Sequence, residues 1–235
     1  MEIPRLIHQI WWDMKAPLEE MPEYYEPHEK MLDFCKEHMI SHRLWSKEAC
    51  EAMAQPYQEL WDSFRYDIQR IDFIRLIILN TYGGLYVDMD IYPVKNIDDL
   101  FEKEEVFVRW SGQKDAYNAI MGTYIQHPIW NELIEESKER TAICQSMDFY
   151  DTKKGRLESQ TTGCRLLTRV LKKGKQSSGK RKHTDFLEIV RVYNEKKKIL
   201  SEGDDYRFQD SSVSGWYDMK KHDPRYFKKH LAPLV

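Results

Sequence analysis

Apolar positions predict a buried helix followed by a short strand in the first half of the chain. Between residues 71 and 79, apolar side chains stand almost all round a helix axis, which is typical of a helix enclosed by a core. Gly83 and Gly84 follow, and glycine accepts the left-handed turn that ends many helices without a Cβ clash. We therefore expect a helix over residues 67–82 and a strand over residues 85–87.

The rest of the chain alternates strand-like and helical segments. Residues 3–12 are apolar on both faces with polar interruptions, which fits a central strand of an α/β sheet. Further strands are predicted at residues 40–45, 91–94, 105–110, 119–123 and 186–193. Helices are predicted at residues 29–38, 47–55, 57–64, 97–101, 127–140 and after Gly163, with a proline-punctuated loop at residues 17–27. This alternation predicts a single α/β domain over residues 1–235, with helices on both faces of a layered sheet.

Two charged residues interrupt the buried helix. Asp72 and Arg75 are spaced i, i+3, so they share one face of an otherwise apolar helix. Buried charges are costly unless they find partners. The two side chains either pair with each other or face a polar ligand, and the spacing leaves both possibilities open.

Asp88 and Asp90 follow the strand after the glycine pair. Their i, i+2 spacing points both carboxylates the same way in an extended segment. Neighbouring carboxylates repel, and the arrangement becomes favourable around a hard divalent cation such as Mg²⁺ or Mn²⁺. Such a cation can clamp a diphosphate and offset the charge of a leaving phosphate. A D-x-D alone is a weak motif, but its place after a buried helix, a glycine pair and an apolar strand makes it more specific.

The composition is that of an ordinary folded protein. The chain has 235 residues, of which 41% are hydrophobic and 32% charged, enough for one domain with a substantial core. The net charge of -3 gives no reason to expect nucleic acid as the main partner. The 7 Trp and 14 Tyr residues suit either a large core or a site that stacks flat rings or sugars.

The cysteines and the first residues bear on location. The chain has four cysteines, at Cys35, Cys50, Cys144 and Cys164. They show neither a C-x-x-C pair nor metal-finger spacing, so we interpret them as reduced thiols of a cytoplasmic protein, bacterial or in a virus-infected host cell. Residues 1–5 lack the apolar run of a signal peptide, and no stretch approaches the length that spans a bilayer. A Golgi lumen location is expected only if an anchor lies outside this sequence.

Trp11 and Trp12 are expected at the carboxyl end of the first strand, where open α/β sheets bind ligands. Either one of these rings stacks on a nucleotide base, or both are core or rim aromatics. His8, earlier in the same segment, is interpreted as a hydrogen-bonded strand histidine rather than a catalyst.

Two later segments suggest anion contacts. Thr161-Thr162-Gly163 precedes a helix, so it is either a simple N-cap or an anion site made by free N–H groups. Residues 172–183 are basic and rich in Gly and Ser, which predicts a mobile surface loop. The alternative interpretation is contact with an anionic acceptor, a phosphate or a membrane surface.

Taken together, these residues resemble glycosyltransferase family 32, a group with a sugar-nucleotide-binding D-x-D that includes capsular polysaccharide and α-mannosyltransferase-like enzymes. More distantly, the chain resembles the clostridial glucosylating toxins. The matching pattern is Ile3-Pro4, Ile7-His8-Gln9-Ile10-Trp11, Leu44-Trp45, Asp72-x-x-Arg75, Tyr82-Gly83-Gly84-Leu85-Tyr86-x-Asp88-x-Asp90, Asn118, His127-Pro128 and Thr162-Gly163. The chain departs from it at Trp12-Asp13, where a glycine pair is frequent, and at Cys164, where proline is usual.

The resemblance implies a GT-A fold, a three-layer sandwich with a mixed, mostly parallel central sheet between helices. It implies retaining transfer from a UDP- or GDP-linked sugar to a glycan or glycoprotein acceptor, with Mn²⁺ or Mg²⁺, and it leaves peripheral membrane contact open. It assigns the donor to Trp11, Asp72, Arg75, Asp88, Asn118, Ser214 and Trp216. It assigns the metal to Asp88, Asp90 and Asp210, and catalysis to Arg75, Asp88 and Asp90.

Two other functions compete with transfer. A phosphohydrolase can use a D-x-D nucleophile after a strand, but Tyr92 stands where such enzymes carry Thr or Val. A non-catalytic sugar-nucleotide-binding protein would use the same pocket without turnover. Release of phosphate from a simple aryl phosphate would identify the first, and nucleotide binding without donor turnover the second.

Overall fold

The computed structural model describes residues 1–12, 16–109, 114–146, 157–177, 186–194, 198–201 and 205–211. The strands are β1 (Leu6–Ile10), β2 (Ser41–Trp45), β3 (Gly84–Val87), β4 (Ile91–Pro93), β5 (Glu105–Val108), β6 (Tyr117–Thr123), β7 (Val190–Asn194), β8 (Lys198–Ser201) and β9 (Phe208–Asp210). The helices are α1 (Pro22–Glu37), α2 (Lys47–Ala54), α3 (Gln58–Ser63), α4 (Asp67–Tyr82), α5 (Asp98–Phe101), α6 (Pro128–Ser146), α7 (Leu157–Thr161) and α8 (Cys164–Ser177), with 3-10 turns at Leu18–Glu20 and Gln55–Tyr57.

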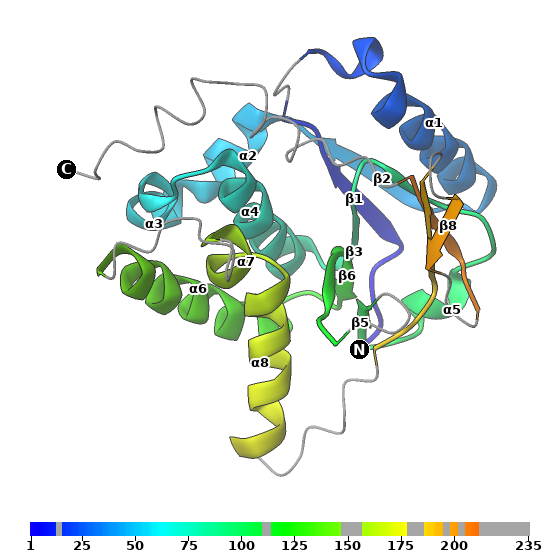
Figure 1. Cartoon of the computed structure of the whole chain (residues 1–235). Helices are drawn as coiled ribbons and strands as arrows, with labels where there is room; N and C mark the ends of the chain where they lie inside the picture. The colour runs from blue at the N-terminus through cyan, green and yellow to red at the C-terminus, as the bar shows by residue number, and fades with distance from the viewer. Residues whose placement is uncertain are drawn as a thin grey trace.

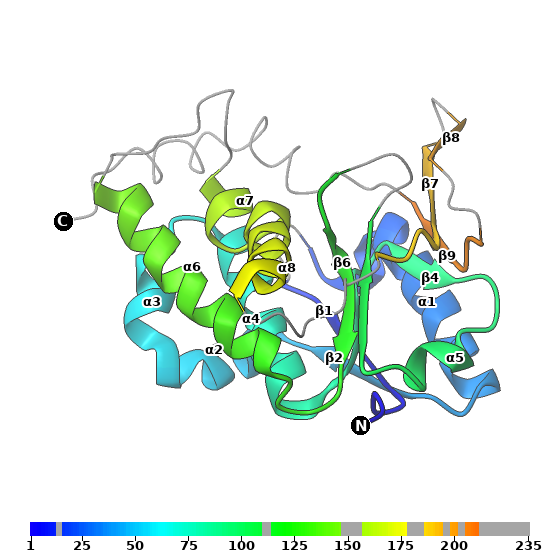
Figure 2. The same cartoon turned by 90° about the horizontal axis from the view of Figure 1, so that it is seen from below.

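The central sheet has the strand order β2-β1-β3-β6-β5. β1 pairs in parallel with β2 and with β3, whereas β6 is antiparallel to both β3 and β5. Helices α2, α4 and α6 lie on one side of this sheet, and α1 and α5 lie on the other (Figures 1 and 2). The prediction of an α/β fold with a mixed sheet between helical layers is therefore confirmed.

β3 shows why both helical layers are held to the sheet. Its side chains alternate between the faces, so that Tyr86 joins the core under α4 and α6 while Leu85 and Val87 join the core under α1 and α5. All three are at most 1% exposed. A strand buried on both faces reads as a continuous apolar run, which is how residues 85–87 appear in the sequence.

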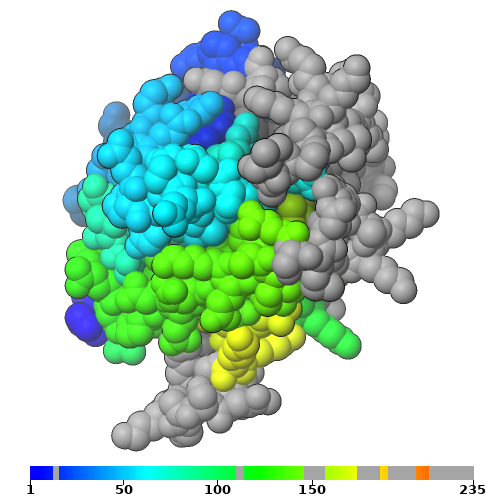
Figure 3. All heavy atoms as spheres, turned by 90° about the vertical axis from the view of Figure 1, so that its left-hand side faces the viewer, coloured from blue at the N-terminus to red at the C-terminus, as the bar shows by residue number. Residues whose placement is uncertain are grey.

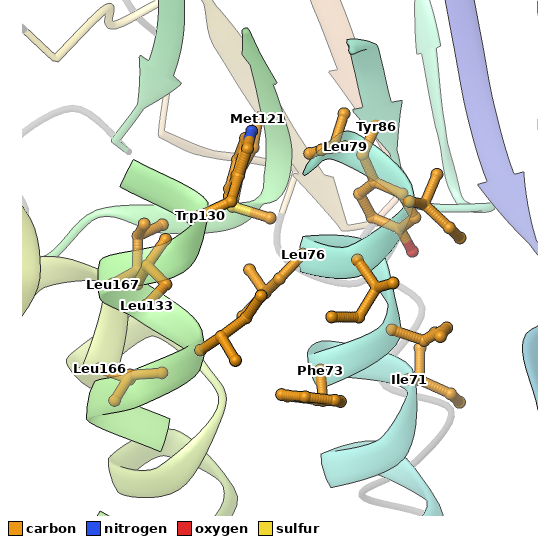
Figure 4. Close-up of a cluster of buried hydrophobic side chains, with 14 of the residues drawn as sticks. Ile71, Phe73, Leu76, Leu79, Tyr86, Met121, Trp130, Leu133, Leu166 and Leu167 are labelled. Atoms are coloured by element: carbon orange, nitrogen blue, oxygen red, sulfur yellow. The ribbon is translucent and has the colours of Figure 1, made fainter. Parts of the chain in front are cut away.

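The larger core fills the space between α4, α6 and α8. Figure 4 shows Phe73 and Leu76 of α4 pointing into this space, which Leu133 of α6 and Leu166 of α8 enter from the opposite side. On the outside of the same layer, α2, α3 and α6 form the light blue, cyan and green parts of the surface in Figure 3, with α8 below them in yellow. Because α4 is covered by the sheet and by other helices, its apolar side chains are buried almost all round, as predicted.

The end of α4 depends on glycine. Gly83 caps the helix with φ 62°, and Gly84 has φ 89°, both in the region that favours glycine. A Cβ on Gly84 would lie 2.4 Å from the Leu6 carbonyl oxygen of β1. The glycine pair therefore lets the chain turn back and run directly beside the first strand.

A second sheet, with the order β4-β9-β7-β8, lies beside α1 and was not predicted as a separate unit. β4 forms its edge, in agreement with the expectation from Pro93, which cannot donate to a ladder. Residues 186–193, expected as one strand, form a bridge at Leu187 and then β7 from Val190. The two short strands that pair with β7 come from residues 198–210, far along the chain from β4.

Two expected loops are partly helical. α1 begins at Pro22 and contains Pro27, although residues 17–27 were expected to be irregular. Pro22 occupies a first-turn position that needs no N–H donor, and Pro27 leaves only the carbonyl of exposed Glu23 without its helical partner. Likewise, α8 covers residues 172–177 of the segment expected as a basic loop, because Lys and Gln are good helix formers. Residues 178–183 lie outside the described part of the chain. In the part that is described, no helix is both long and apolar enough to cross a membrane.

Candidate active site

The predicted site residues meet where β3 ends beside the start of β6. Asp72 and Arg75 lie on α4, Asp88 follows β3, and Asn118 lies in β6. Since β3 and β6 are antiparallel neighbours, the end of one adjoins the beginning of the other. The Asp88 N–H accordingly donates to the Ala119 carbonyl at 2.9 Å.

Arg75 is the centre of this group, and its side chain is only 3% exposed. Nη2 lies 3.0 Å from Oδ1 of Asp72, and Nη1 lies 3.3 Å from Oδ1 of Asp88. Nη1 also donates to the main-chain carbonyl of Asn118 at 2.7 Å, which ties α4 to β6. The question that the sequence left open is thus answered for the protein alone: Asp72 and Arg75 pair with each other, and Arg75 also reaches the first D-x-D carboxylate.

Burial is the main influence on both carboxylates. It raises the pKa of Asp72 to about 7, and the guanidinium of Arg75 acts in the opposite direction. Burial also raises the pKa of Asp88, again opposed by Arg75. The guanidinium of Arg75 therefore opposes the protonation that burial favours at both carboxylates.

The hydroxyl of Tyr86 fixes the orientation of the Asp88 side chain. It donates to Oδ1 of Asp88 at 2.7 Å, and the guanidinium carbon of Arg75 lies 4.4 Å from the centre of the Tyr86 ring. The Asp88 side chain keeps 32% of its surface exposed. It can meet a ligand while Arg75 and Tyr86 fix its position.

Asp90 and Asp210 are brought together by the second sheet. β4 pairs with β9 in a register that puts Asp210 opposite the residue that follows Asp90. Oδ2 of Asp210 accepts a hydrogen bond of 2.7 Å from the Tyr117 hydroxyl. Burial raises the pKa of Tyr117 well above its ordinary value, and the charges of Asp210, Asp90 and Asp88 raise it further. The charges of the three carboxylates predicted as metal ligands therefore all act on the Tyr117 hydroxyl, which bonds one of them, Asp210.

The donor atoms of this cluster suit a hard divalent cation. Carboxylate oxygens are what Mg²⁺ and Mn²⁺ prefer, and Asp88 and Asp90 are both half-buried. Over the ranges given above, no three or more His, Cys, Asp or Glu side chains stand as a ready-made metal site. A cation held by these carboxylates would complete its coordination with diphosphate oxygens and water, as Mg²⁺ commonly does.

The structure separates the two tryptophans that follow β1. Trp12 is 4% exposed and packs against Trp61, so it belongs to the core. Trp11 is half-buried, with its ring centre 5.4 Å from that of Tyr24. The buried Nε1 atoms of both rings have no acceptor within hydrogen-bond distance among the described residues, so the two tryptophans differ in the exposure of their rings. Only Trp11 therefore remains a candidate for contact with a base.

The side chain of Asn118 is held by Asp72 and Cys164. Nδ2 donates to Oδ1 of Asp72 at 2.9 Å, and Oδ1 accepts from Sγ of Cys164 at 2.9 Å. Gly163 comes so close that a Cβ there would lie 3.0 Å from Oδ2 of Asp72. The Thr-Gly-Cys segment thus packs directly on the Asp72 carboxylate, at the start of α8.

His8 is a satisfied strand histidine, as interpreted. Trp45 Nε1 donates to its Nδ1 at 3.2 Å, so the ring proton lies on Nε2, which donates to the Gly83 carbonyl at 2.9 Å. Burial lowers the pKa of His8 to about 4, and the ring is fully buried.

Sequence reasoning missed three polar residues at the site. Tyr86, Tyr117 and Gln9 each bind a D-x-D residue or Asp210. Tyr86 and Gln9 lie in strands that look like core in the sequence, and Tyr117 lies just before the strand expected at residues 119–123. For the two tyrosines, the available signal was their alternation with apolar residues at the ends of strands. Ser214 and Trp216, predicted to contact the donor, lie outside the described residues.

Comparison with known proteins agrees with the resemblance seen in the sequence. Residues 18–107 match the family described as glycosyltransferase sugar-binding region containing DXD motif. The matched segment includes Asp72, Arg75, Asp88 and Asp90, so the sequence-based recognition of a D-x-D glycosyltransferase region is confirmed.

Relatives and one solved structure extend the comparison. The chain is 30% identical over 140 residues, 58% of its length, to mannosyl phosphorylinositol ceramide synthase CSH1 of Saccharomyces cerevisiae, and covers 35% of that protein. It is 30% identical over 137 residues, 56% of its length, to inositol phosphoceramide mannosyltransferase 3 of Schizosaccharomyces pombe, and covers 36% of it. The chain thus spans about a third of the length of these relatives. The structure titled PaToxG Glycosyltransferase aligns with a TM-score of 0.52 and 18% identity, over 74% of this chain and 70% of that one, which supports the fold.

Proposed function

Because residues 18–107 carry the sugar-binding region of the D-x-D glycosyltransferases, we propose that this chain transfers a sugar from a nucleoside-diphosphate donor in a metal-dependent reaction. The observation that carries the proposal is the buried array in which Arg75 holds both Asp72 and Asp88, with Asp90 and Asp210 beside them. This array prepares carboxylate oxygens at the end of a strand before any ligand binds.

The residues divide into those that meet the donor and those that support them. Asp88, Asp90 and Asp210 would hold Mn²⁺ or Mg²⁺, which when bound offsets the charge of the departing diphosphate. Trp11, with its unpartnered buried N–H among the described residues, would contact the base. Asn118 and Asp72 would line the sugar side, held by Cys164 and Arg75.

We propose retention of the anomeric configuration, with the acceptor hydroxyl attacking on the face that the phosphate leaves. The carboxylates of Asp72 and Asp88 each accept bonds from protein groups through Oδ1, which suits orientation better than covalent attack. Product stereochemistry, read by proton NMR of the anomeric signal, tests this part of the proposal.

The decisive variant is Asp90→Asn, which keeps the size of the side chain and removes its charge. Transfer from GDP-mannose, UDP-glucose and UDP-N-acetylglucosamine would be measured with and without Mn²⁺. We expect the donor that the wild type uses to give no turnover with Asp90→Asn, at an unchanged unfolding temperature. Near-normal turnover by the variant, with metal present, would refute the role of Asp90.

The acceptor is the finer part of the proposal. The names of the relatives combine a mannosyl group with an inositol phosphoceramide acceptor, and we propose that this chain also takes a phosphate-bearing acceptor. A cleft along α8 is lined by Asp115, Gln160, Arg165, Thr168, Arg169 and Lys172. Its cations lie on α8, whose first residue bonds Asn118. These features support a place for the acceptor phosphate next to the donor site.

A pair of variants tests the acceptor. Arg165→Glu with Lys172→Glu should raise the KM for glycerophosphoinositol as acceptor, while Lys36→Glu, an exposed charge change on α1, should not. Equal KM values for the two variants would contradict a phosphate site in this cleft.

Location stays a proposal as well. All four cysteines are free thiols, and three of them are buried. We propose a reducing compartment such as the cytoplasm, where such thiols persist.

A further inference from the structure

Gln9 links a pair of histidines to the D-x-D segment. Its side chain is fully buried at the end of β1. Nε2 lies 3.3 Å from the main-chain carbonyl of Asp88, while Oε1 lies 2.7 Å from Nδ1 of His28 and 3.1 Å from Nε2 of His42. The histidines come from α1 and β2, so three elements converge on one amide.

The chemistry of these groups fixes the orientation of the amide. A carbonyl can only accept, so the group of Gln9 that faces Asp88 must be the NH₂. The carbonyl oxygen of Gln9 then faces both imidazoles, and each ring must donate an N–H to it. The rings themselves are in contact, with centres 5.2 Å apart. Gln9 has therefore one orientation that satisfies all its neighbours.

The carbonyl that Gln9 holds belongs to a tight turn. The Ile91 N–H donates to the same Asp88 carbonyl at 3.1 Å, which closes the turn over residues 88–91. This turn carries both D-x-D carboxylates and leads into β4, which sets the position of Asp210. A shift of the Asp88 peptide would therefore move the whole set of oxygens together.

We propose that Gln9 is a positioning residue for the D-x-D turn, held in its working orientation by His28 and His42. The inference rests on the proposed function, since it assigns Gln9 to the support of the same carboxylates. Gln9 acts through the Asp88 main chain and leaves the carboxylate of Asp88 to Tyr86 and Arg75. Outer groups that orient metal ligands typically contribute about 10-fold to 100-fold to metal affinity or activity.

The test is a Mn²⁺ titration of Gln9→Met, which keeps the length of the side chain and removes the amide, followed both as sugar transfer and as Mn²⁺-dependent binding of GDP and UDP. We expect the apparent Mn²⁺ constant, which is the Mn²⁺ concentration at half-maximal effect, to rise about tenfold or more. We also expect kcat to be reduced and the KM for the donor to change less. Thr123→Val serves as the matched control, because it also removes a buried hydrogen bond, to Trp130, at the far end of β6. The control should lose stability without any change in the Mn²⁺ constant.

A second variant tests the same proposal if Gln9→Met does not fold. His42→Phe removes one of the two donors to Gln9 from a half-buried strand position and should raise the Mn²⁺ constant by roughly threefold, a smaller share of the same effect. A folded variant of either kind with the wild-type Mn²⁺ constant and kcat overturns the inference. A wild type without donor turnover and without metal-dependent nucleotide binding instead removes the proposed function, so the two failures are distinguishable.

Discussion

Acid should destabilise this fold through His8, and the expected size follows from its surroundings. The ring is fully buried between Trp45 and Gly83, and burial lowers its pKa from 6.5 to about 4. The unfolded chain therefore binds a proton between these pH values while the folded chain does not. For a histidine whose folded pKa is depressed, the stability is fully present above the unfolded pKa of 6.5 and is lost as the pH falls towards the folded value.

The magnitude comes from the linkage relation. The difference between 6.5 and about 4 corresponds to about 3 kcal/mol over the whole window, and to about 2 kcal/mol by about pH 5. Other groups also titrate in this range, so the quantity to measure is a difference between two proteins. His8→Gln keeps an N–H donor and a carbonyl acceptor at the position but does not titrate.

Urea unfolding followed by circular dichroism at about pH 8 and about pH 5 gives the four free energies needed. We expect the wild type to lose about 2 kcal/mol more than His8→Gln over this interval. Equal losses in the two proteins would show that His8 is protonated in the folded state at the lower pH. Its burial would then not lower its pKa as expected. A smaller loss with a changed m-value would instead point to altered compactness of one state.

Two further substitutions test the packing that supports the site. Arg75→Met should reduce the free energy of unfolding by about 3–5 kcal/mol, because it leaves the carboxylates of Asp72 and Asp88 buried without their cation; an unchanged urea midpoint would contradict the buried ion pair. Gly84→Ala should reduce it by about 2 kcal/mol or more, because φ is 89° and the new Cβ would lie 2.4 Å from the Leu6 carbonyl; a wild-type midpoint would show that β1 can move away.

Local chemistry along α4 and β3 made this part of the fold predictable. An all-round apolar helix, a glycine pair and a two-sided apolar strand each have one favourable arrangement, and the helix Asp67–Tyr82 was expected with these same bounds. The second sheet was not predictable in this way. A strand was expected where β4 lies, but the three-residue strand β9 was not, and no local pattern marks the pairing of the two across a long separation in sequence.

The same contrast between local patterns and distant contacts applies to the site residues. Asp72, Arg75, Asp88 and Asp90 could be singled out, because charges inside or directly after apolar segments need a reason. Gln9 was part of the pattern shared with the family but was given no role, because one polar residue in a central strand has the same appearance whether it serves packing or position. Its role depends on two histidines from other elements and a carbonyl, all distant in sequence.

The contacts of Arg75 bear on how the site would work. With 3% of its side chain exposed and its Nη atoms on Asp72, Asp88 and Asn118, the guanidinium is engaged by the protein itself. In the proposed reaction its positive charge would act on the donor through the carboxylates that it orients, rather than by direct contact with a phosphate. Such an arrangement fixes the carboxylates before the donor arrives, and preorganised charge of this kind costs little reorganisation when the sugar–phosphate bond breaks.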